Sequence, residues 1–268
     1  MGPNGLEAAY KEGAMELVQL MHDGPVSRLM LARPERRNAL SLALMQEVIA
    51  ALDDLPEETQ AVVIGGLGPA FSAGHDLEEM LDRDLAFYRE LFDVCTQMME
   101  IVRTIPQPVI ARVHGPAYAA GCQLVAACDL AVAADTATFA TPGVKIGLFC
   151  STPMVPVSRA IGRKRAMEML LTGEPISALT AQEWGLVNRV VPADALDEAV
   201  DELVGQITSF SAHVAGIGKK AFYAQIDLDE RRAYELTKDV MASNAELADA
   251  QEGIGAFVGK RQPAWSNR

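Results

Sequence analysis

Apolar and polar positions follow two different periods in the first part of the chain. Short apolar runs at 16–21 and 26–31 flank Asp23-Gly24, a dipeptide typical of tight hairpin turns. Between Ser41 and Leu55 the apolar residues return every three or four positions behind a capping serine. The pattern therefore predicts an antiparallel hairpin followed by an amphipathic helix.

Farther along the chain, strand and helix patterns alternate. Short apolar strands are predicted at 61–64, 109–113, 130–133 and 138–140, and helices at 85–104 and 119–127. Such alternation is typical of parallel strands joined by helical crossovers. From Pro153 onward the pattern is almost entirely helical, with a capping-box pattern at Thr180–Glu183 and one strand at 187–191.

The length of the chain fits one α/β core with an appendage. It has 268 residues, of which half are apolar, and this is enough to bury a large core. Residues 1–13 show no period and are predicted to contribute nothing to the fold. We expect the core to occupy 14–205 and a helical region, a packing layer or an oligomerisation arm, to occupy 206–268.

Charge and cysteine content exclude several classes of function. The net charge of −13 argues against a nucleic-acid partner, which needs a clustered basic face. No apolar run is long enough to span a membrane, so no membrane partner is expected. The four cysteines form no CxxC pair and have no histidine at metal-ligand spacing, which indicates reduced thiols, a cytoplasmic protein and no metal site.

Two loops rich in glycine and alanine are the candidates for chemistry. Residues 68–77 and 114–124 each follow a predicted strand and precede a predicted helix. Small side chains let a ligand approach the backbone, and amides at a helix start carry partial positive charge. Two such loops could direct N–H groups at one oxygen that becomes negative during a reaction. Loops of this composition are also common as purely structural turns.

These loops and several shorter motifs resemble the crotonase (enoyl-CoA hydratase/isomerase) family. The resemblance runs in order from about residue 15 to the C-terminus. Its motifs are Arg33–Leu40, Phe71–Leu77 with Glu79 and Met80, Gly115–Leu124, Cys128–Leu130, Leu171–Gly173, Gly185–Val187, and Glu252–Phe257 with Lys260 and Arg261. Residues 119–123, 141–143 and 148–153 are most similar to the subgroup called enoyl-CoA hydratase domain-containing protein 3.

The resemblance implies a fold, a ligand and an assembly. The fold is the crotonase-like (ClpP/crotonase) α/β superhelix of repeated crossovers, with a helical C-terminal trimerisation region. The ligand is an acyl-coenzyme A thioester, with coenzyme A as part of the substrate and no permanently bound cofactor. A homotrimer, or a homohexamer formed as a dimer of trimers, is expected.

The resemblance also implies roles for individual residues. The backbone N–H groups of Ala73 and Ala120 would hold the thioester oxygen as it becomes an enolate. The coenzyme A residues implied by the same motifs are Arg37, Ala39, Leu40, Asp76, Leu77, Phe257 and Lys260. The last two would come from the same subunit or from a neighbouring one.

The two glutamates that the family's hydratases use are both replaced. The aligned positions hold Gln123 and Gly143, neither of which exchanges a proton near neutral pH. Losing both groups would make hydration very slow. His75 and Gln123 are therefore the remaining catalytic candidates, and a histidine at this place resembles that of methylmalonyl-CoA decarboxylases.

Several reactions remain open. Hydratase-like lyase or isomerase chemistry, decarboxylation by His75 and thioester hydrolysis can all use the same oxyanion hole. The alternative is a catalytically silent acyl-CoA binder. Lys145 beside the predicted acyl pocket is either a partner for a second carboxylate or a solvated surface lysine.

Overall fold

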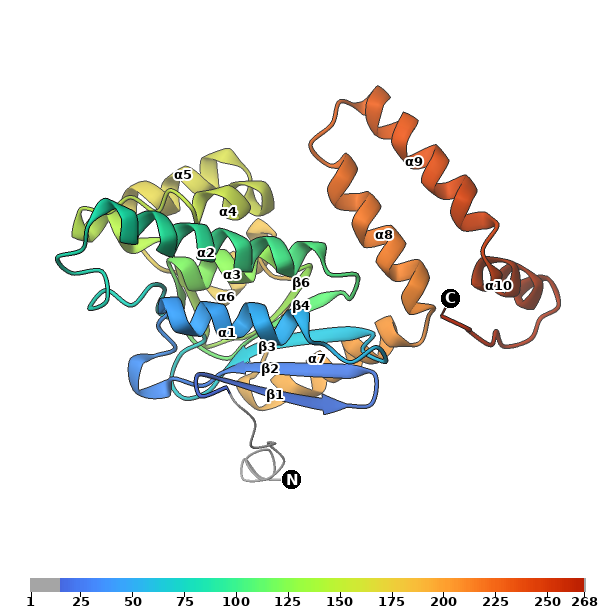
Figure 1. The fold of residues 1–268 in the computed structure, drawn as a ribbon, viewed down its shortest axis with the longest axis horizontal. Helices are drawn as coiled ribbons and strands as arrows, with labels where there is room; N and C mark the ends of the chain where they lie inside the picture. Colours follow the sequence, from blue (N-terminus) through green and yellow to red (C-terminus); the bar gives the residue numbers. More distant parts are fainter. Residues whose placement is uncertain (1–14, 268) are drawn as a thin grey trace.

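The main sheet contains six strands. The computed structural model describes residues 15–267, so the predicted N-terminal segment 1–13 lies outside the described residues. The strand order is β1-β2-β3-β4-β6-β9, and Figure 1 labels β1 to β4 and β6. Their bounds are β1 Val18–Asp23, β2 Val26–Leu31, β3 Ala61–Gly66, β4 Val109–Val113, β6 Leu130–Ala134 and β9 Arg189–Val191. The β1–β2 hairpin is antiparallel and the other pairs are parallel, which confirms the predicted hairpin and crossovers.

Helices cover both faces of this sheet because successive strand residues point to opposite sides. Ala61 and Val63 of β3 pack toward α7 (Leu196–Thr208). Val62 and Ile64 pack into the larger core. That core also contains the buried faces of α1 (Leu42–Asp53), α2 (Leu85–Thr104) and α3 (Ala120–Ala127).

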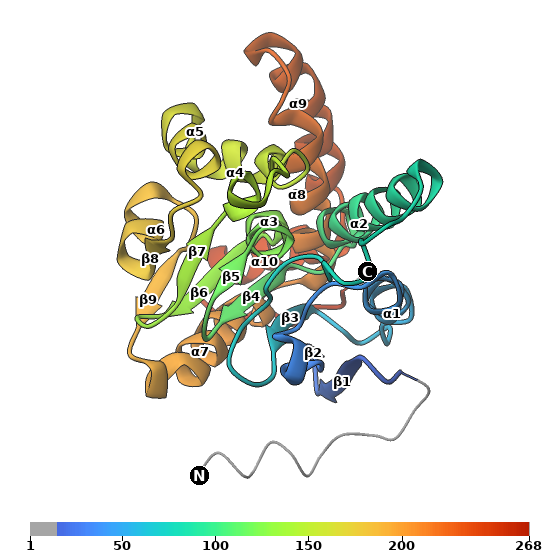
Figure 2. The same ribbon diagram turned by 90° about the vertical axis from the view of Figure 1, so that its left-hand side faces the viewer.

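A second, smaller sheet lies next to the main one and leads into α3 (Figure 2). Its strands are β5 Ala117–Tyr118, β7 Thr138–Ala140 and β8 Ile176–Ser177, in the order β5-β7-β8. Because β5 ends just before α3, pairing of β5 with β7 fixes where that helix begins. The sequence did not predict β5 and β8, which are only two residues long.

Several shorter helices lie between the strands. They are η1 Pro34–Arg36, η2 Pro142–Ile146, α4 Met154–Ile161, α5 Arg163–Thr172, α6 Ala178–Trp184 and η3 Ala193–Ala195. The predicted capping box at Thr180 is wrong. Helix α6 starts at Ala178, and the Ser177 side chain caps it by accepting a hydrogen bond from the Thr180 amide at 3.1 Å.

The last three helices form an arm that extends from one side of the core (Figure 1). They are α8 Ala212–Gln225, α9 Glu230–Ala245 and α10 Ala248–Val258. Lys219 joins α8 to the core, because its Nζ contacts Asp129 Oδ2 at 2.7 Å and donates to the Val102 carbonyl at 2.8 Å. Tyr223 donates to the other Asp129 oxygen at 2.8 Å.

The tail after α10 folds back onto the arm. Asp249, which is 1% exposed, accepts hydrogen bonds from Ser211, Ser266 and Asn267. The predicted helical C-terminal region is therefore present. No helix within residues 15–267 is both long and apolar enough to cross a membrane.

Candidate active site

The two loops rich in glycine and alanine lie against each other, as predicted. The Tyr118 amide donates to the Ser72 carbonyl at 2.9 Å, and the Phe71 amide donates to the Pro116 carbonyl at 3.0 Å. Ser72 and Ala117 form an isolated parallel bridge between the loops. The crossovers of neighbouring strands therefore bring both loops to one place at the edge of the core.

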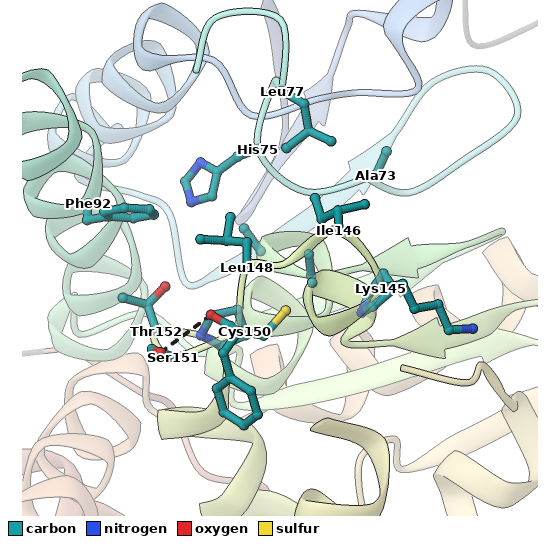
Figure 3. Close-up of a pocket in the computed structure, with 16 residues that line it drawn as sticks. Ala73, His75, Leu77, Phe92, Lys145, Ile146, Leu148, Cys150, Ser151 and Thr152 are labelled. Atoms are coloured by element: carbon teal, nitrogen blue, oxygen red, sulfur yellow. Dashed lines mark hydrogen bonds between the residues drawn. The ribbon is translucent and has the colours of Figure 1, made fainter. Parts of the chain in front are cut away.

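A cavity of about 400 Å³ opens beside these loops (Figure 3). His75 and Leu77 come from the first loop and Ala120 from the second. Phe92 of α2 forms another wall, and the segment 142–153 closes the opposite side. The lining is mostly apolar, and a cavity of this size falls within the usual range for small-molecule sites.

The amide of Ala73 is not available to a ligand. It donates a hydrogen bond to the carbonyl oxygen of Arg37 at 3.0 Å. The prediction that Ala73 supplies one of two oxyanion amides is therefore contradicted, although Ala73 does line the cavity. The Ala73 amide instead fixes the first loop to the turn at Arg37.

Two other residues that line the cavity have backbone amides without a partner. Neither the His75 nor the Ala120 N–H donates a hydrogen bond to any residue that the structure describes. Gly74, the residue before His75, lies close to Ala120, since a β-carbon added to Gly74 would be 3.2 Å from the Ala120 nitrogen. The same β-carbon would be 2.8 Å from the Ala119 β-carbon, so only glycine permits this approach. The two unpaired amides therefore belong to adjacent stretches of backbone.

The residue before Ala120 has a strained backbone. Ala119 adopts φ 48° and ψ −116°, a conformation that residues with a side chain rarely adopt. Such a backbone typically costs about 1–3 kcal/mol and is concentrated at functional sites. Ala120 is the first residue of α3, so its amide carries the partial positive charge of a helix start.

The His75 imidazole faces the cavity without a polar partner. Its ring packs edge-on against Phe92, with ring centroids 5.4 Å apart and an interplanar angle of 84°. Both ring nitrogens are shielded from solvent, and neither has a hydrogen-bond partner among the described residues. Burial lowers the pKa of His75. The ring is therefore neutral near pH 7 and can accept a proton.

The two positions at which a hydratase glutamate is predicted to be replaced differ in their surroundings. A β-carbon added to Gly143 would lie 2.0 Å from the Leu148 carbonyl oxygen, so no side chain fits there without a backbone shift. Gln123 is buried and is not among the cavity-lining residues. Its Oε1 lies 3.9 Å from the Cys95 sulfur on α2. Gln123 therefore faces a neighbouring helix within the core, which does not support the predicted catalytic candidacy.

Two further cavity-lining side chains can be titrated. Burial raises the pKa of the Cys150 thiol, which keeps it protonated and poorly nucleophilic. Lys145 forms an ion pair with Glu174 at 2.7 Å. Among the described residues that line the cavity, His75 is therefore the one titratable group with neither an ion-pair partner nor a raised pKa.

The structure does not bring the predicted coenzyme A residues together in one place within the single chain. Arg37 is exposed beside the first loop, whereas Ala39 and Leu40 are buried beneath it. Leu77 lines the cavity. Asp76 does not line it, because its carboxylate pairs with Arg33 at 3.0 Å.

Phe257 and Lys260 are at the end of α10, on the arm. Phe257 is 86% exposed, and neither residue lines the cavity within the single chain. Their predicted contact with coenzyme A, from the same or a neighbouring subunit, stays a prediction.

Comparison with known proteins identifies relatives over almost the whole chain. The model of the family described as Enoyl-CoA hydratase/isomerase matches residues 22–268. This chain belongs to that family. The mouse (Mus musculus) protein named "Enoyl-CoA hydratase domain-containing protein 3, mitochondrial" is 44% identical, with 99% of this chain and 89% of the mouse protein covered.

Solved structures confirm the crotonase-like fold. An enoyl-CoA hydratase from Mycobacterium smegmatis superimposes with a TM-score of 0.92 and 46% identity, covering 93% of this chain and 99% of that one. Human enoyl-CoA hydratase domain-containing protein 3 gives a TM-score of 0.91 and 43% identity, covering 93% and 100%. The predicted resemblance to this subgroup of the enoyl-CoA hydratase/isomerase family is therefore confirmed.

The sequence analysis did not predict that the His75 amide is unpaired, or that Phe92 and Leu148 form apolar walls of the cavity. One signal for the amide was available, because Gly74 is the kind of residue that a close approach of two backbones requires. Phe92 and Leu148 are distant in sequence from the first loop, and only the tertiary fold brings them to the cavity.

Proposed function

We propose that this member of the enoyl-CoA hydratase/isomerase family binds an acyl-CoA thioester and polarises the thioester carbonyl between the His75 and Ala120 amides. The observation that carries the proposal is the pair of unpaired N–H groups beside one apolar cavity. Buried amides without partners are rare in folded proteins. A ligand carbonyl oxygen would supply the partner that both lack.

This arrangement favours reactions that pass through an enolate. Negative charge that develops on the thioester oxygen would be stabilised by both amides, and one preorganised donor of this kind contributes about 3–4 kcal/mol to a transition state. The positive end of α3 adds to the effect at Ala120. Lyase or isomerase chemistry at the α-carbon is therefore favoured over a reaction without carbonyl polarisation.

Hydration is not the reaction that the site supports. Gly143 has no room for a side chain, and Gln123 does not line the cavity. His75 is the remaining candidate for handling a proton, since its neutral ring faces the cavity. A base beside a polarised thioester can move a proton between carbon atoms, which is isomerisation. Decarboxylation assisted by His75 is a second candidate.

The rival proposal is a silent acyl-CoA binder. It is favoured by Gln123 and Gly143, because neither can exchange a proton, while the two unpaired amides could still bind a thioester carbonyl. The two proposals share the ligand and differ only in turnover.

Assembly, location and cofactors remain predictions. A homotrimer or homohexamer is expected, with the arm helices at the interfaces. A cytoplasmic location is predicted from the sequence, whereas the names of the mouse and human relatives say mitochondrial. Coenzyme A is expected only as part of the substrate, with no permanently bound cofactor.

The first experiment removes the oxygen from the ligand instead of the amides from the protein. Butyryl-CoA and S-butyl-CoA differ in the thioester carbonyl, and calorimetry measures both affinities. Two hydrogen bonds should make the thioester bind about 5- to 150-fold more tightly. Equal affinity for the two ligands would contradict the proposed carbonyl site.

The second experiment separates enzyme from silent binder. Crotonyl-CoA, methylmalonyl-CoA and a 3-enoyl-CoA are incubated with wild type, His75→Ala and the control His213→Ala, which changes an exposed histidine outside the cavity. Turnover lost only in His75→Ala supports an enzyme with His75 at the reacting carbon. Binding without turnover of any of the three supports the silent binder.

A further inference from the structure

A short turn joins the core to the arm. It consists of residues 209–211, between the end of α7 and the start of α8, and we call it the corner. Helix ends leave backbone groups that need partners. Here Trp265 Nε1 donates to the Ser209 carbonyl at 2.9 Å, and the Ala212 amide donates to Asn267 Oδ1 at 2.8 Å. Two residues from the segment after α10 therefore bind both sides of the corner.

The same segment, residues 262–267, also binds a carboxylate on α10, and we call this segment the strap. Asp249 on α10 is 1% exposed. Its Oδ1 accepts from the Ser266 amide and hydroxyl, both at 2.7 Å, and its Oδ2 accepts from the Asn267 amide at 2.9 Å. The Ser211 hydroxyl of the corner also donates to Oδ2. Because hydrogen bonds to a charged group are stronger than those between neutral groups, one buried carboxylate connects α10, the strap and the corner.

The Trp265 ring adds an apolar contact between the strap and α10. A β-carbon added to Gly253 would be 3.1 Å from Cη2 of the ring, so the ring lies directly on the glycine. Ile207 near the end of α7 and Phe210 of the corner line the same groove as Trp265. A tryptophan suits this place because its ring is apolar while its N–H can reach a carbonyl. The ring therefore connects the end of α7 with α10.

The strap closes the arm into a ring of connected elements. Lys219 holds α8 on the core, whereas α10 lies two helices farther along the chain. Figure 1 shows the chain running from α10 back toward the start of α8. Closing such a loop restricts the motion of the parts within it. Phe257 and Val258, which are 86% and 76% exposed, lie at the end of α10, shortly before the strap.

From the contacts of Asp249 and Trp265 we propose that the strap is a conformational latch of the arm. While the strap is bound to the corner, it fixes α10 and the exposed apolar side chains at the end of this helix. When the strap is released, α10 moves relative to α8, and α8 stays attached to the core through Lys219. The inference concerns the arm alone and goes beyond the proposed acyl-CoA function.

Fluorescence of Trp265 tests whether the position of the strap depends on the contact with Gly253. The chain has two tryptophans, so Trp184→Phe leaves Trp265 as the remaining reporter. In that background Gly253→Val should displace the indole, which shifts its emission to longer wavelength and increases its quenching by acrylamide. Gly255→Val is the matched control, because Gly255 is at an open position of the same helix. The same emission and quenching in both variants would overturn the proposed latch.

Limited digestion with trypsin tests the role of the buried carboxylate. Trypsin cleaves after Arg261, directly before the strap. Asp249→Asn should make this cleavage about 10-fold faster, because local opening controls the access of the protease. The control Asp239→Asn, at an exposed position on α9, should change the rate by less than about twofold. Unchanged cleavage after Arg261 in Asp249→Asn would contradict the proposed latch.

Hydrogen exchange locates the motion within the arm. In Asp249→Asn the amides of α10 should exchange about 10-fold faster than in wild type, while those of α8 and α9 should change by less than about twofold. Equally faster exchange along all three helices would show that Asp249 supports the whole arm, and the latch would be wrong. These measurements contain no acyl-CoA. Failure of the latch would therefore leave the preference for butyryl-CoA over S-butyl-CoA intact, and the two proposals fail separately.

Discussion

A β-carbon at Gly143 would overlap the carbonyl oxygen of Leu148, at a separation of 2.0 Å. The Leu148 amide in turn donates to the Gly143 carbonyl at 2.9 Å, so the two residues hold each other in place. Gly143 is one of the two positions at which the family resemblance predicts that a hydratase glutamate is replaced. The Leu148 backbone therefore occupies the space that a side chain at this position would need.

Restoring the glutamate at this position should fail. Gly143→Glu is expected to lower the free energy of unfolding by about 1–3 kcal/mol, because overpacking forces the backbone to move. It should give no gain in crotonyl-CoA hydration. Gly205→Glu, at an open position in α7, is the control and should raise stability by about 0.5–1 kcal/mol. Thermal unfolding and the loss of enoyl absorbance measure both effects, and a stable, active Gly143→Glu would refute this explanation.

Gly74 should be essential for the pair of free amides. Gly74→Ala introduces a β-carbon 2.8 Å from that of Ala119, at a backbone φ of 92°. The loops must separate, so the preference for butyryl-CoA over S-butyl-CoA should fall toward one. Retention of the full preference in a folded Gly74→Ala protein would contradict the assignment of the amides. Circular dichroism and calorimetry on the same sample distinguish the outcomes.

Ala119→Gly should stabilise the protein. The strained φ of 48° and ψ of −116° cost glycine little, and the relief should exceed the entropy that glycine adds to the unfolded chain. A gain of about 1 kcal/mol in the free energy of unfolding is expected from denaturant titration. Ala126→Gly inside α3 is the control and should lose about 1 kcal/mol.

Protonation of His75 should lower the stability of the fold as pH falls. Burial lowers the pKa of His75 in the folded state below 6.5, so the unfolded state binds more protons as pH falls. The contribution of His75 is therefore fully present above pH 6.5 and is lost as pH falls from 6.5 through the lowered folded pKa. His75→Phe should show a shallower loss of stability than wild type over this range. Parallel curves for wild type and His75→Phe would show that the ring is not shielded.

The ion pair between Lys219 and Asp129 should hold the arm against the core. Removing one partner of a buried ion pair leaves the other charge uncompensated, and Lys219→Met should cost about 3–5 kcal/mol. Lys220→Met, at the exposed neighbouring position, should change stability by less than about 0.5 kcal/mol. Denaturant unfolding checks both, and equal effects would show that Asp129 does not depend on Lys219.

The sequence predicted these elements because the spacing of their apolar residues fits one type of element, helix or strand. The helix at 85–104 and the strands at 109–113 and 138–140 agree with α2, β4 and β7 at every boundary. The error at Thr180 arose because Ser177, three residues earlier, competes for the same capping role. A local pattern cannot decide between two such caps when the preceding strand has only two residues.

The candidate site was predicted in outline and corrected in detail. The meeting of the two loops followed from the crossover pattern, and Ala120 keeps a free amide. Ala73 was misassigned because the hydrogen bond from its amide to Arg37 spans 36 positions of the chain. The position of Gln123 likewise depends on α2, whose Cys95 faces it. Such contacts have no signal in the local sequence.

The hydrogen bond from the Ala73 amide to the Arg37 carbonyl connects the first loop, which carries the His75 amide, to a residue predicted to bind coenzyme A. If the Arg37 side chain grips the nucleotide portion, then docking of that portion also steadies the backbone from which the His75 amide projects. Thioesters truncated to N-acetylcysteamine would lack this handle. These truncated thioesters should therefore show weaker polarisation of the thioester carbonyl as well as lower affinity. Binding of the nucleotide portion would thus influence the reactivity of the distant acyl group.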